Sequence, residues 1–212
     1  SVTLLSSPLQ GFTDFRFRNA FHKHFGGIDK FYSPYIRLNG KLEIKASYER
    51  DILPENNTTL EVIPQIITND ADEFLFVAKY VQSLGYKELN WNLGCPYPMV
   101  AKCGMGSGLI SNTERIHSIL DKVHSETNIV VSMKMRMGYE NAAEILEVFP
   151  ILEKYPIKNI AIHARIGKQV YKGDVDLDSF QRCLDVSKHK LYYNGDITSV
   201  EKFRDMQARF PS

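Results

Sequence analysis

Residues 88–96 of the chain read Glu88-Leu89-Asn90-Trp91-Asn92-Leu93-Gly94-Cys95-Pro96. A short β-prone run ends here in polar residues and a proline turn, and six similar runs occur elsewhere in the chain. We therefore predict seven strands, at residues 3–9, 30–38, 60–67, 88–94, 129–138, 159–165 and 190–197.

Longer amphipathic stretches separate these strands. They predict helices at residues 14–25, 69–84, 112–127, 141–155, 177–187 and 199–210, with one or two further helical turns within residues 41–59. Several begin with helix-capping sequences, such as residues 69–72, 111–114 and 198–201. Strands that alternate with helices indicate parallel βα units.

Two α/β folds are built from such units, an open doubly wound sheet and a closed barrel. A dinucleotide-binding sheet would show a glycine fingerprint after its first strand, which residues 8–14 lack. Polar residues instead stand at the carboxyl ends of the strands, where a barrel gathers its active site. They are Gln65, Asn92 with Cys95, Lys134 with Arg136, His163 with Arg165, and Asn194 with Asp196. We therefore predict a TIM (β/α)8 barrel.

Only seven βα units are visible in the 212 residues. A TIM barrel typically needs about 250 residues, and seven strands leave two unpaired edges. We expect residues 1–212 to be a single catalytic barrel domain that is incomplete at its carboxyl end, with the eighth unit missing.

Composition and charge argue against a disordered chain, a membrane-spanning protein and a globally basic nucleic-acid binder. The chain is 43% apolar and 24% charged, as in folded globular proteins. No run approaches the ~18 apolar residues of a membrane-spanning helix, so we expect no membrane insertion. A net charge of +1 gives no global field for a polyanion, so nucleic acid would have to bind local patches.

The cysteines and histidines indicate a reducing compartment without a metal site. An odd number of cysteines (Cys95, Cys103 and Cys183) leaves at least one thiol free, and residues 1–8 carry no secretory signal. We predict a cytoplasmic protein. The six histidines are scattered and no Cys-x-x-Cys spacing occurs, so no metal is expected.

Cys95 and the cations on the next strand are the strongest candidates for chemistry. A cysteine at a strand end before a glycine-rich loop is placed to move a proton, although a buried structural cysteine is the alternative. Lys134 and Arg136 share one strand face, and inward cations need an anionic partner such as a cofactor ring or phosphate. A solvated pair at the strand end is the other interpretation.

The last two strands add weaker candidates. His163 and Arg165 again share a face, and the loop that follows supplies Lys168 and Tyr171, a patch suited to a phosphate backbone with a stacked base. A solvated loop is the alternative. Residues 194–196 stand where barrels commonly bind phosphate, although the same sequence is also an ordinary turn.

Together these residues resemble the tRNA-dihydrouridine synthase family of flavin enzymes. The resemblance runs through residues 8–14 with Phe17-Arg18, Pro64-Gln65, residues 92–96 with Val100, Lys134-Met135-Arg136, His163-Ala164-Arg165 with Gln169 and Tyr171, and Asn194-Gly195-Asp196. The chain differs where the family usually has Met at Leu9, Gly at Cys103, Thr at Ile166 and Trp at Leu177.

The resemblance implies a barrel that binds FMN, is reduced by NADPH and acts as a monomer on uridine in tRNA. It implies that Cys95 is the general acid and that Cys103 is not. The implied substrate contacts are Asn92, Arg165, Lys168 and Tyr171, with Asn92 orienting the uracil. The implied cofactor contacts are Pro8, Leu9, Gln65, Lys134, His163, Asn194, Gly195 and Asp196. The family also has an eighth barrel strand and a carboxyl-terminal helical domain for tRNA, which we expect to lie outside residues 1–212.

Two other functions stay open from the sequence. One is an FMN-dependent dihydroorotate or dihydropyrimidine dehydrogenase acting on a free pyrimidine, for which carboxylate-binding residues would be needed. The other is a non-catalytic RNA-binding relative, against which the presence of both Cys95 and Lys134 argues.

Overall fold

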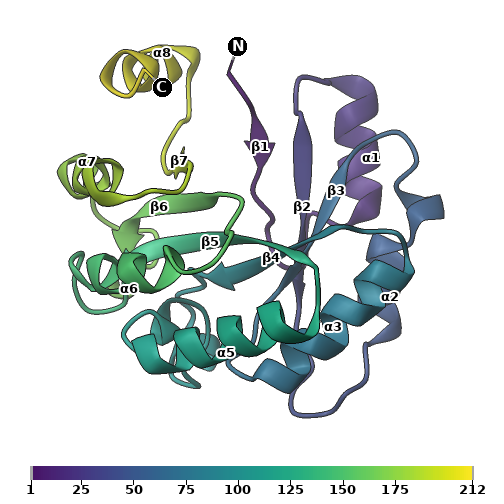
Figure 1. Cartoon of the computed structure of the whole chain (residues 1–212). Coiled ribbons are helices and arrows are strands. Elements are labelled where there is room, and N and C mark those ends of the chain that lie inside the picture. Colours follow the sequence, from purple (N-terminus) through teal and green to yellow (C-terminus); the bar gives the residue numbers. More distant parts are fainter. Residues whose placement is uncertain (1, 212) are drawn as a thin grey trace.

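The computed structural model describes residues 2–211 as an α/β fold on one seven-stranded sheet. All strands are parallel and follow chain order, so the sheet curls into seven units of a TIM barrel with its helices outside, which confirms the predicted fold (Figure 1). The strands are β1 (Leu5–Ser6), β2 (Lys30–Ile36), β3 (Val62–Ile66), β4 (Glu88–Leu93), β5 (Val130–Gly138), β6 (Ile160–Ile166) and β7 (Leu191–Asn194).

The predicted helices are all present. They are α1 (Phe15–His24), α2 (Ala46–Ile52), α3 (Ala71–Ser83), α5 (Thr113–Glu126), α6 (Glu144–Leu152), α7 (Leu177–Val186) and α8 (Val200–Arg209), with a short α4 (Pro98–Ala101) and the 3-10 turns η1 (Pro54–Asn56), η2 (Gly106–Leu109) and η3 (Gly167–Gln169). Asp70, Asn112 and Ser199 each accept the backbone N–H three residues on, as their sequence predicts. Across residues 2–211 no helix combines the length and apolar character needed to span a membrane.

Most boundaries agree with the prediction to within one or two residues, and three elements differ most. β1 keeps only two residues because it pairs with β2 alone. β7 stops at Asn194 because Gly195 and Asp196 have φ of 132° and 54°, which a strand does not accommodate. α6 begins at Glu144 rather than at residue 141 because the Glu144 carboxylate accepts the N–H groups of residues 139–141 and holds them in a turn.

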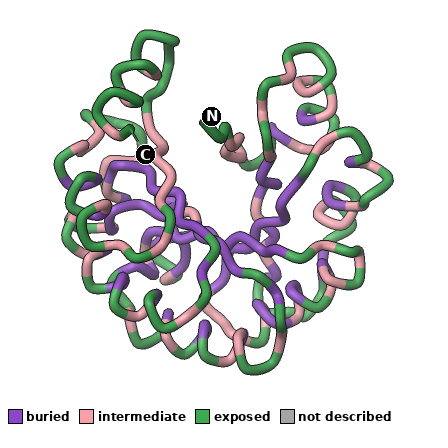
Figure 2. Tube along the Cα trace, turned by 45° about the horizontal axis from the view of Figure 1, so that its top comes forward, coloured by how far each residue is buried: buried purple, intermediate pink, exposed green. Residues whose placement is uncertain are grey.

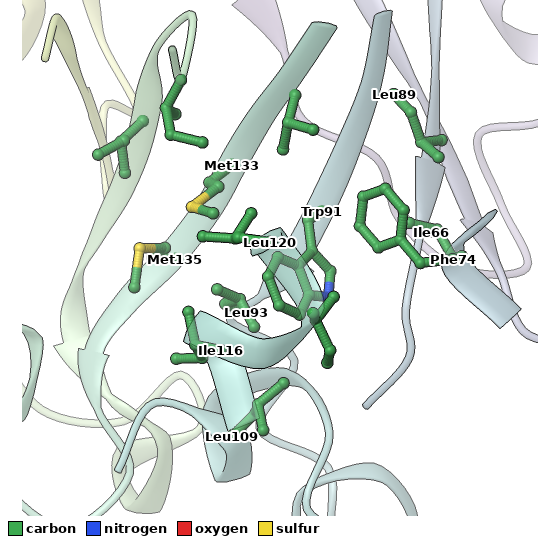
Figure 3. Close-up of a cluster of buried hydrophobic side chains, with 14 of the residues drawn as sticks. Ile66, Phe74, Leu89, Trp91, Leu93, Leu109, Ile116, Leu120, Met133 and Met135 are labelled. Carbon is green, nitrogen blue, oxygen red and sulfur yellow. The ribbon is translucent and has the colours of Figure 1, made fainter. Parts of the chain in front are cut away.

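The hydrophobic core lies between the sheet and its helices. Figure 3 shows Trp91 of β4, fully buried, beside Phe74 of α3, with ring centroids 5.5 Å apart, and Met133 and Met135 of β5 in the same layer. Strand side chains alternate between faces. The residues between these apolar ones therefore face the interior of the barrel, and they are polar, as Asn90 is.

The sheet is open between its first and last strands. Within residues 2–211, β1 and β7 do not pair, and Figure 2 shows the two ends of the chain on either side of this opening. One side-chain contact bridges it, from Asn194 Nδ2 to Ser7 Oγ at 3.1 Å. Helix α8 buries none of its residues.

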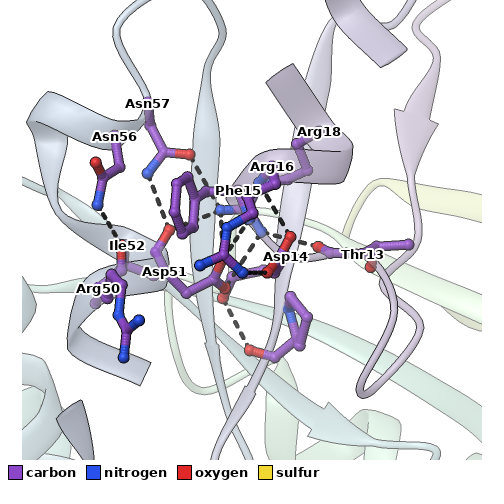
Figure 4. A network of polar contacts seen from close by, with 12 residues as sticks. Thr13, Asp14, Phe15, Arg16, Arg18, Arg50, Asp51, Ile52, Asn56 and Asn57 are labelled. Carbon is purple, nitrogen blue, oxygen red and sulfur yellow. Dashed lines mark hydrogen bonds and ion pairs between the residues drawn. The ribbon is translucent and has the colours of Figure 1, made fainter. Parts of the chain in front are cut away.

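A buried ion pair anchors the loop that follows β1. Arg18, 1% exposed, pairs with Asp51 at 3.0 Å and donates to Thr13 O and Asn57 Oδ1, each at 3.0 Å (Figure 4). Asp51 Oδ1 also accepts the backbone N–H of Phe15 at 2.6 Å. The network ties α1 to α2 and, through Thr13 O, holds the end of the loop between β1 and α1 in place.

We expect Asp51→Ala to lower the free energy of unfolding by about 3–5 kcal/mol, because it leaves the Arg18 charge buried and unpaired. Lys188→Ala is the matched control, since it breaks the exposed pair with Glu153 and should change stability by at most about 1 kcal/mol. Urea denaturation measures both. Equal losses for the two variants would contradict the anchoring role.

Candidate active site

The carboxyl end of β4 turns sharply at Cys95. Asn92 Oδ1 accepts hydrogen bonds from the backbone N–H groups of Gly94 and Cys95, each at 3.0 Å. An asparagine that accepts from the backbone two and three residues on closes an Asx-type turn. This turn fixes the backbone from which the Cys95 side chain projects.

The glycine-rich segment after α4 packs back onto Cys95. The Cys95 carbonyl accepts hydrogen bonds from the Ser107 backbone N–H at 3.0 Å and from the Ser107 hydroxyl at 2.9 Å. At Gly106, with φ of 57°, a Cβ would lie 2.6 Å from the same carbonyl, so glycine is required there. The glycine-rich segment is therefore hydrogen-bonded to the backbone of Cys95.

The Cys95 thiol is buried and keeps its proton at neutral pH. It belongs to a small apolar cluster against which Tyr35 of β2 packs. Burial raises the pKa of the Cys95 thiol, and this outweighs the opposing effects of the Tyr97 backbone N–H and the Tyr35 hydroxyl. The charges of Arg136 and Lys134 lower this pKa less. A protonated thiol at a strand end is equipped to act as a general acid.

Lys134 and Arg136 project from β5 toward the barrel interior. No carboxylate among residues 2–211 forms an ion pair with Lys134, and burial, followed by the charge of Arg136, lowers the pKa of Lys134 to about 8. Arg136 donates to Ile166 O at 3.0 Å, and its guanidinium lies 5.2 Å from the centroid of the Tyr171 ring. Among residues 2–211, Lys134 is therefore a cation without a counter-ion, and the anionic partner expected for it stays a prediction.

His163 is neutral, and its tautomer follows from its neighbour. Burial lowers the pKa of His163 to about 3, with further contributions from the charges of Arg136 and Lys134. His163 Nε2 lies 3.0 Å from Arg165 Nη1, and a guanidinium can only donate. The ring proton therefore sits on Nδ1, which is left to donate to a ligand.

Arg165 holds three segments together from within. Besides His163, its Nη1 donates to Asp196 Oδ1 at 2.8 Å, and its Nη2 donates to Asp196 Oδ2 and to Gly173 O, each at 2.6 Å. All four terminal N–H groups are thus engaged inside the protein. Arg165 is buried and holds the loop of residues 167–175 through Gly173, and the substrate contact that the resemblance implies for it stays a prediction.

Two further predicted substrate residues, Lys168 and Tyr171, lie on the outside of that loop. Lys168 forms an exposed ion pair with Glu140. Tyr171 is 55% exposed, and its ring centroid lies 6.1 Å from that of His163. Both remain available to a large ligand at this edge of the barrel.

Pro8 and Leu9 lie in the loop after β1, which docks on β2 close to Cys95. Gln10 makes two hydrogen bonds to the backbone of Tyr35, from its Nε2 to Tyr35 O at 3.2 Å and from Tyr35 N to its Oε1 at 2.9 Å. Leu9 remains exposed. The structure therefore brings Leu9 to the same edge as the residues from β4 to β7.

Gln65, an expected cofactor contact, lies in the barrel interior and bonds to other side chains. It is fully buried, donates to Asn90 Oδ1 at 2.9 Å and accepts from Asn92 Nδ2 at 3.0 Å. Sequence reasoning missed Asn90, as it missed Tyr35 and Ser107. The signal for Asn90 was its spacing of two from Asn92, which puts both on one strand face.

Comparison with known proteins finds one family throughout. The family model described as "Dihydrouridine synthase (Dus)" matches residues 4–210. The chain is 29% identical to tRNA-dihydrouridine synthase B of Pseudomonas putida, over 95% of the chain and 59% of that relative. It is 28% identical to tRNA-dihydrouridine(16) synthase of Pseudomonas syringae pv. tomato, over 93% and 64% respectively. The chain thus spans about three-fifths of the length of these curated relatives.

The unpaired Lys134 should destabilise the fold at neutral pH. Its folded pKa of about 8 lies below the ordinary lysine value of 10.5, so the wild type gains stability as pH rises from about 8 toward 10.5. We expect Lys134→Met to be more stable than wild type at pH 7, with the difference shrinking by pH 10. Urea denaturation at both pH values measures it, with exposed Lys168→Met as the control. A pH-independent difference would be inconsistent with a depressed lysine pKa.

Proposed function

The chain belongs to the dihydrouridine synthase family, and from this premise we propose that the whole protein reduces the 5,6 double bond of a uridine in tRNA. FMN is the proposed cofactor and NADPH the reductant. The observation that carries the proposal is a protonated thiol, Cys95, held on a rigid turn beside the uncompensated cation Lys134.

The charges at the carboxyl edge fit a flavin mononucleotide. Lys134, Arg136 and Arg165 lie there, and among residues 2–211 only Arg165 of these three forms an ion pair, with Asp196, so an anionic group would be attracted. At Gly195 a Cβ would meet Val175 at 3.0 Å, so the backbone there packs closely without a side chain. These features support a site for an anionic, phosphate-bearing ligand.

The proposed cofactor contacts divide by the chemistry of their groups. Lys134 supplies positive charge, and His163 supplies a neutral N–H donor from Nδ1. Gln65 supports the site from inside the barrel through Asn92. The remaining proposed contacts come from the loops at the two ends of the sheet and are Pro8, Leu9, Asn194, Gly195 and Asp196.

The proposed reaction needs one proton from the protein. Bound FMN, once reduced by NADPH, would supply hydride to one carbon of the double bond. Cys95 donates its proton to the neighbouring carbon, so that the base gains two hydrogens and the double bond is lost. The thiolate that remains is stabilised by the Tyr97 N–H, the Tyr35 hydroxyl and the nearby cations. Solvent then returns the proton to Cys95.

The proposed substrate contacts follow the exposure of each residue. A uridine stacked in folded RNA must turn out to reach Cys95, at a cost of a few kcal/mol. Asn92 would orient the uracil, while Tyr171 and Lys168, which are exposed, would contact the flanking RNA. Arg165 would act through the loop of residues 167–175 that it holds.

We further propose that residues 2–211 are the catalytic barrel of a longer, monomeric, cytoplasmic protein. The unpaired edges of β1 and β7 support an eighth βα unit that closes the barrel, and the greater length of the relatives supports an additional helical tRNA-binding domain. The three free cysteines are compatible with a reducing compartment.

We expect the whole protein to purify with non-covalent FMN and to bind it less tightly as pH rises through about 8, because Lys134 then loses its charge. Lys134→Ala should weaken retention and flatten this pH dependence, whereas Lys168→Ala should do neither. Flavin fluorescence titrations at pH 7 and pH 9.5 measure the effect. A protein that shows no flavin absorbance after incubation with FMN would rule the cofactor out.

Cys95→Ala should still be reduced by NADPH but form dihydrouridine at least ~100-fold more slowly, since a positioned general acid contributes ~10²–10⁴-fold. Cys103→Ala is the matched control, because Cys103 is exposed and lines a separate cleft of about 550 Å³ with Arg37 and Asn69. Single-turnover oxidation of the reduced flavin by tRNA measures both. A slow Cys103→Ala beside a normal Cys95→Ala would reverse the assignment.

A further inference from the structure

A continuous series of side-chain hydrogen bonds crosses the barrel interior from its amino end to the Asn92 turn. Ser132 Oγ donates to Glu88 Oε2 at 2.8 Å, and Asn90 Nδ2 donates to Ser132 Oγ at 2.9 Å. Gln65 Nε2 then donates to Asn90 Oδ1 at 2.9 Å, and Asn92 Nδ2 donates to Gln65 Oε1 at 3.0 Å. All five residues are buried. We call these five residues the interior series.

Every hydrogen bond of the interior series is donated in the same direction, from Asn92 toward Glu88. At each end, groups that can only donate or only accept fix this direction. At the upper end, Asn92 Oδ1 faces the backbone N–H groups of Gly94 and Cys95, which only donate. At the lower end, the Glu88 carboxylate accepts from Ser132 and pairs with Lys158 through its other oxygen. The amides between these ends therefore have one consistent orientation.

This orientation decides what Asn92 can offer to a ligand. Its Oδ1 has two lone pairs, and the N–H groups of Gly94 and Cys95 occupy both. One of its two Nδ2–H groups is donated to Gln65. A single N–H donor remains, and no acceptor.

Polar groups in this position are not required for packing. Apolar side chains of similar volume in place of a buried polar network are often neutral or stabilising. A fully satisfied network instead specifies one arrangement of the groups it contains. The interior series therefore has a role in orientation that an apolar filling could not perform.

We infer that Glu88, Ser132, Asn90 and Gln65 are positioning residues, which hold Asn92 with its N–H toward the substrate and its oxygen on the Cys95 turn. The inference rests on the proposed function for the identity of the substrate. The remaining N–H of Asn92 then donates to a carbonyl oxygen of the base. Cytosine carries an amino group at carbon 4 in place of that oxygen, so two donors would face each other and cytosine would not bind.

Hydrogen exchange of the ligand-free protein tests the positioning role directly. Ser132→Ala interrupts the interior series, and the isosteric Glu88→Gln weakens its charged end. We expect the Gly94 and Cys95 amides to exchange about 10-fold faster in Ser132→Ala and about 3-fold faster in Glu88→Gln, relative to the amides of α5. Lys158→Met keeps the Glu88 acceptor and should change these rates by less than about 2-fold.

Unchanged rates at Gly94 and Cys95 in the variants would overturn the inference. Glu88→Gln provides this test even where Ser132→Ala does not fold. A merely structural role would instead raise exchange in α5 and at the Cys95 turn by the same factor, and that result would also refute positioning.

Turnover by the whole protein separates the inference from the proposed function. With tRNA as substrate, Glu88→Gln should lower kcat several-fold with little change in KM, because the defect lies in orientation rather than in RNA binding. Faster exchange in the variants, combined with no tRNA reduction by wild type, would refute the proposed function and support the positioning of Asn92. Equal kcat in wild type and Glu88→Gln would refute the role in turnover.

Discussion

The alternation of side chains along parallel strands is the constraint on which the rest of the molecule depends. In β4, Trp91 faces the helices and the two asparagines that flank it face the barrel interior. The same alternation in β5 puts Met133 and Met135 outside and Lys134 inside. The apolar layer stabilises the fold from the outside. The interior face is thereby free to carry polar groups, and a shift of one residue in any strand would exchange the two.

The site combines groups that disfavour one another in the absence of a ligand. Lys134 has no counter-ion, and the surrounding positive charge helps to keep His163 neutral. Such arrangements reduce stability but keep binding groups in place before a ligand arrives. Cys95 is a similar case, because burial disfavours the thiolate, raises the pKa of the thiol and so keeps it protonated. The chemical properties of the site at the carboxyl edge of the sheet thus arise because its charges are not fully paired within the protein.

Much of the fold was predictable, because strand runs, caps and strand-end polar residues are local signals. Asp70 and Asn112 cap their helices as expected, and Lys134 lies on the predicted face. The partners of each polar side chain were not predictable, since they come from strands far apart in sequence. Asp196, thirty-one residues from Arg165, is such a partner, and the substrate contact expected of Arg165 stays a prediction. Tyr35 was missed for the same reason, because only folding brings β2 against Cys95.

Arg165 joins two segments that would bind different molecules. Its guanidinium holds the loop of residues 167–175 through Gly173 and the segment after β7 through Asp196. A molecule that orders one segment leaves less conformational entropy for the other to lose. If the two segments bind RNA and cofactor as proposed, their affinities would be thermodynamically coupled through this one side chain, and each ligand would strengthen the binding of the other by the same factor. A single buried arginine would thereby make the two proposed sites cooperative.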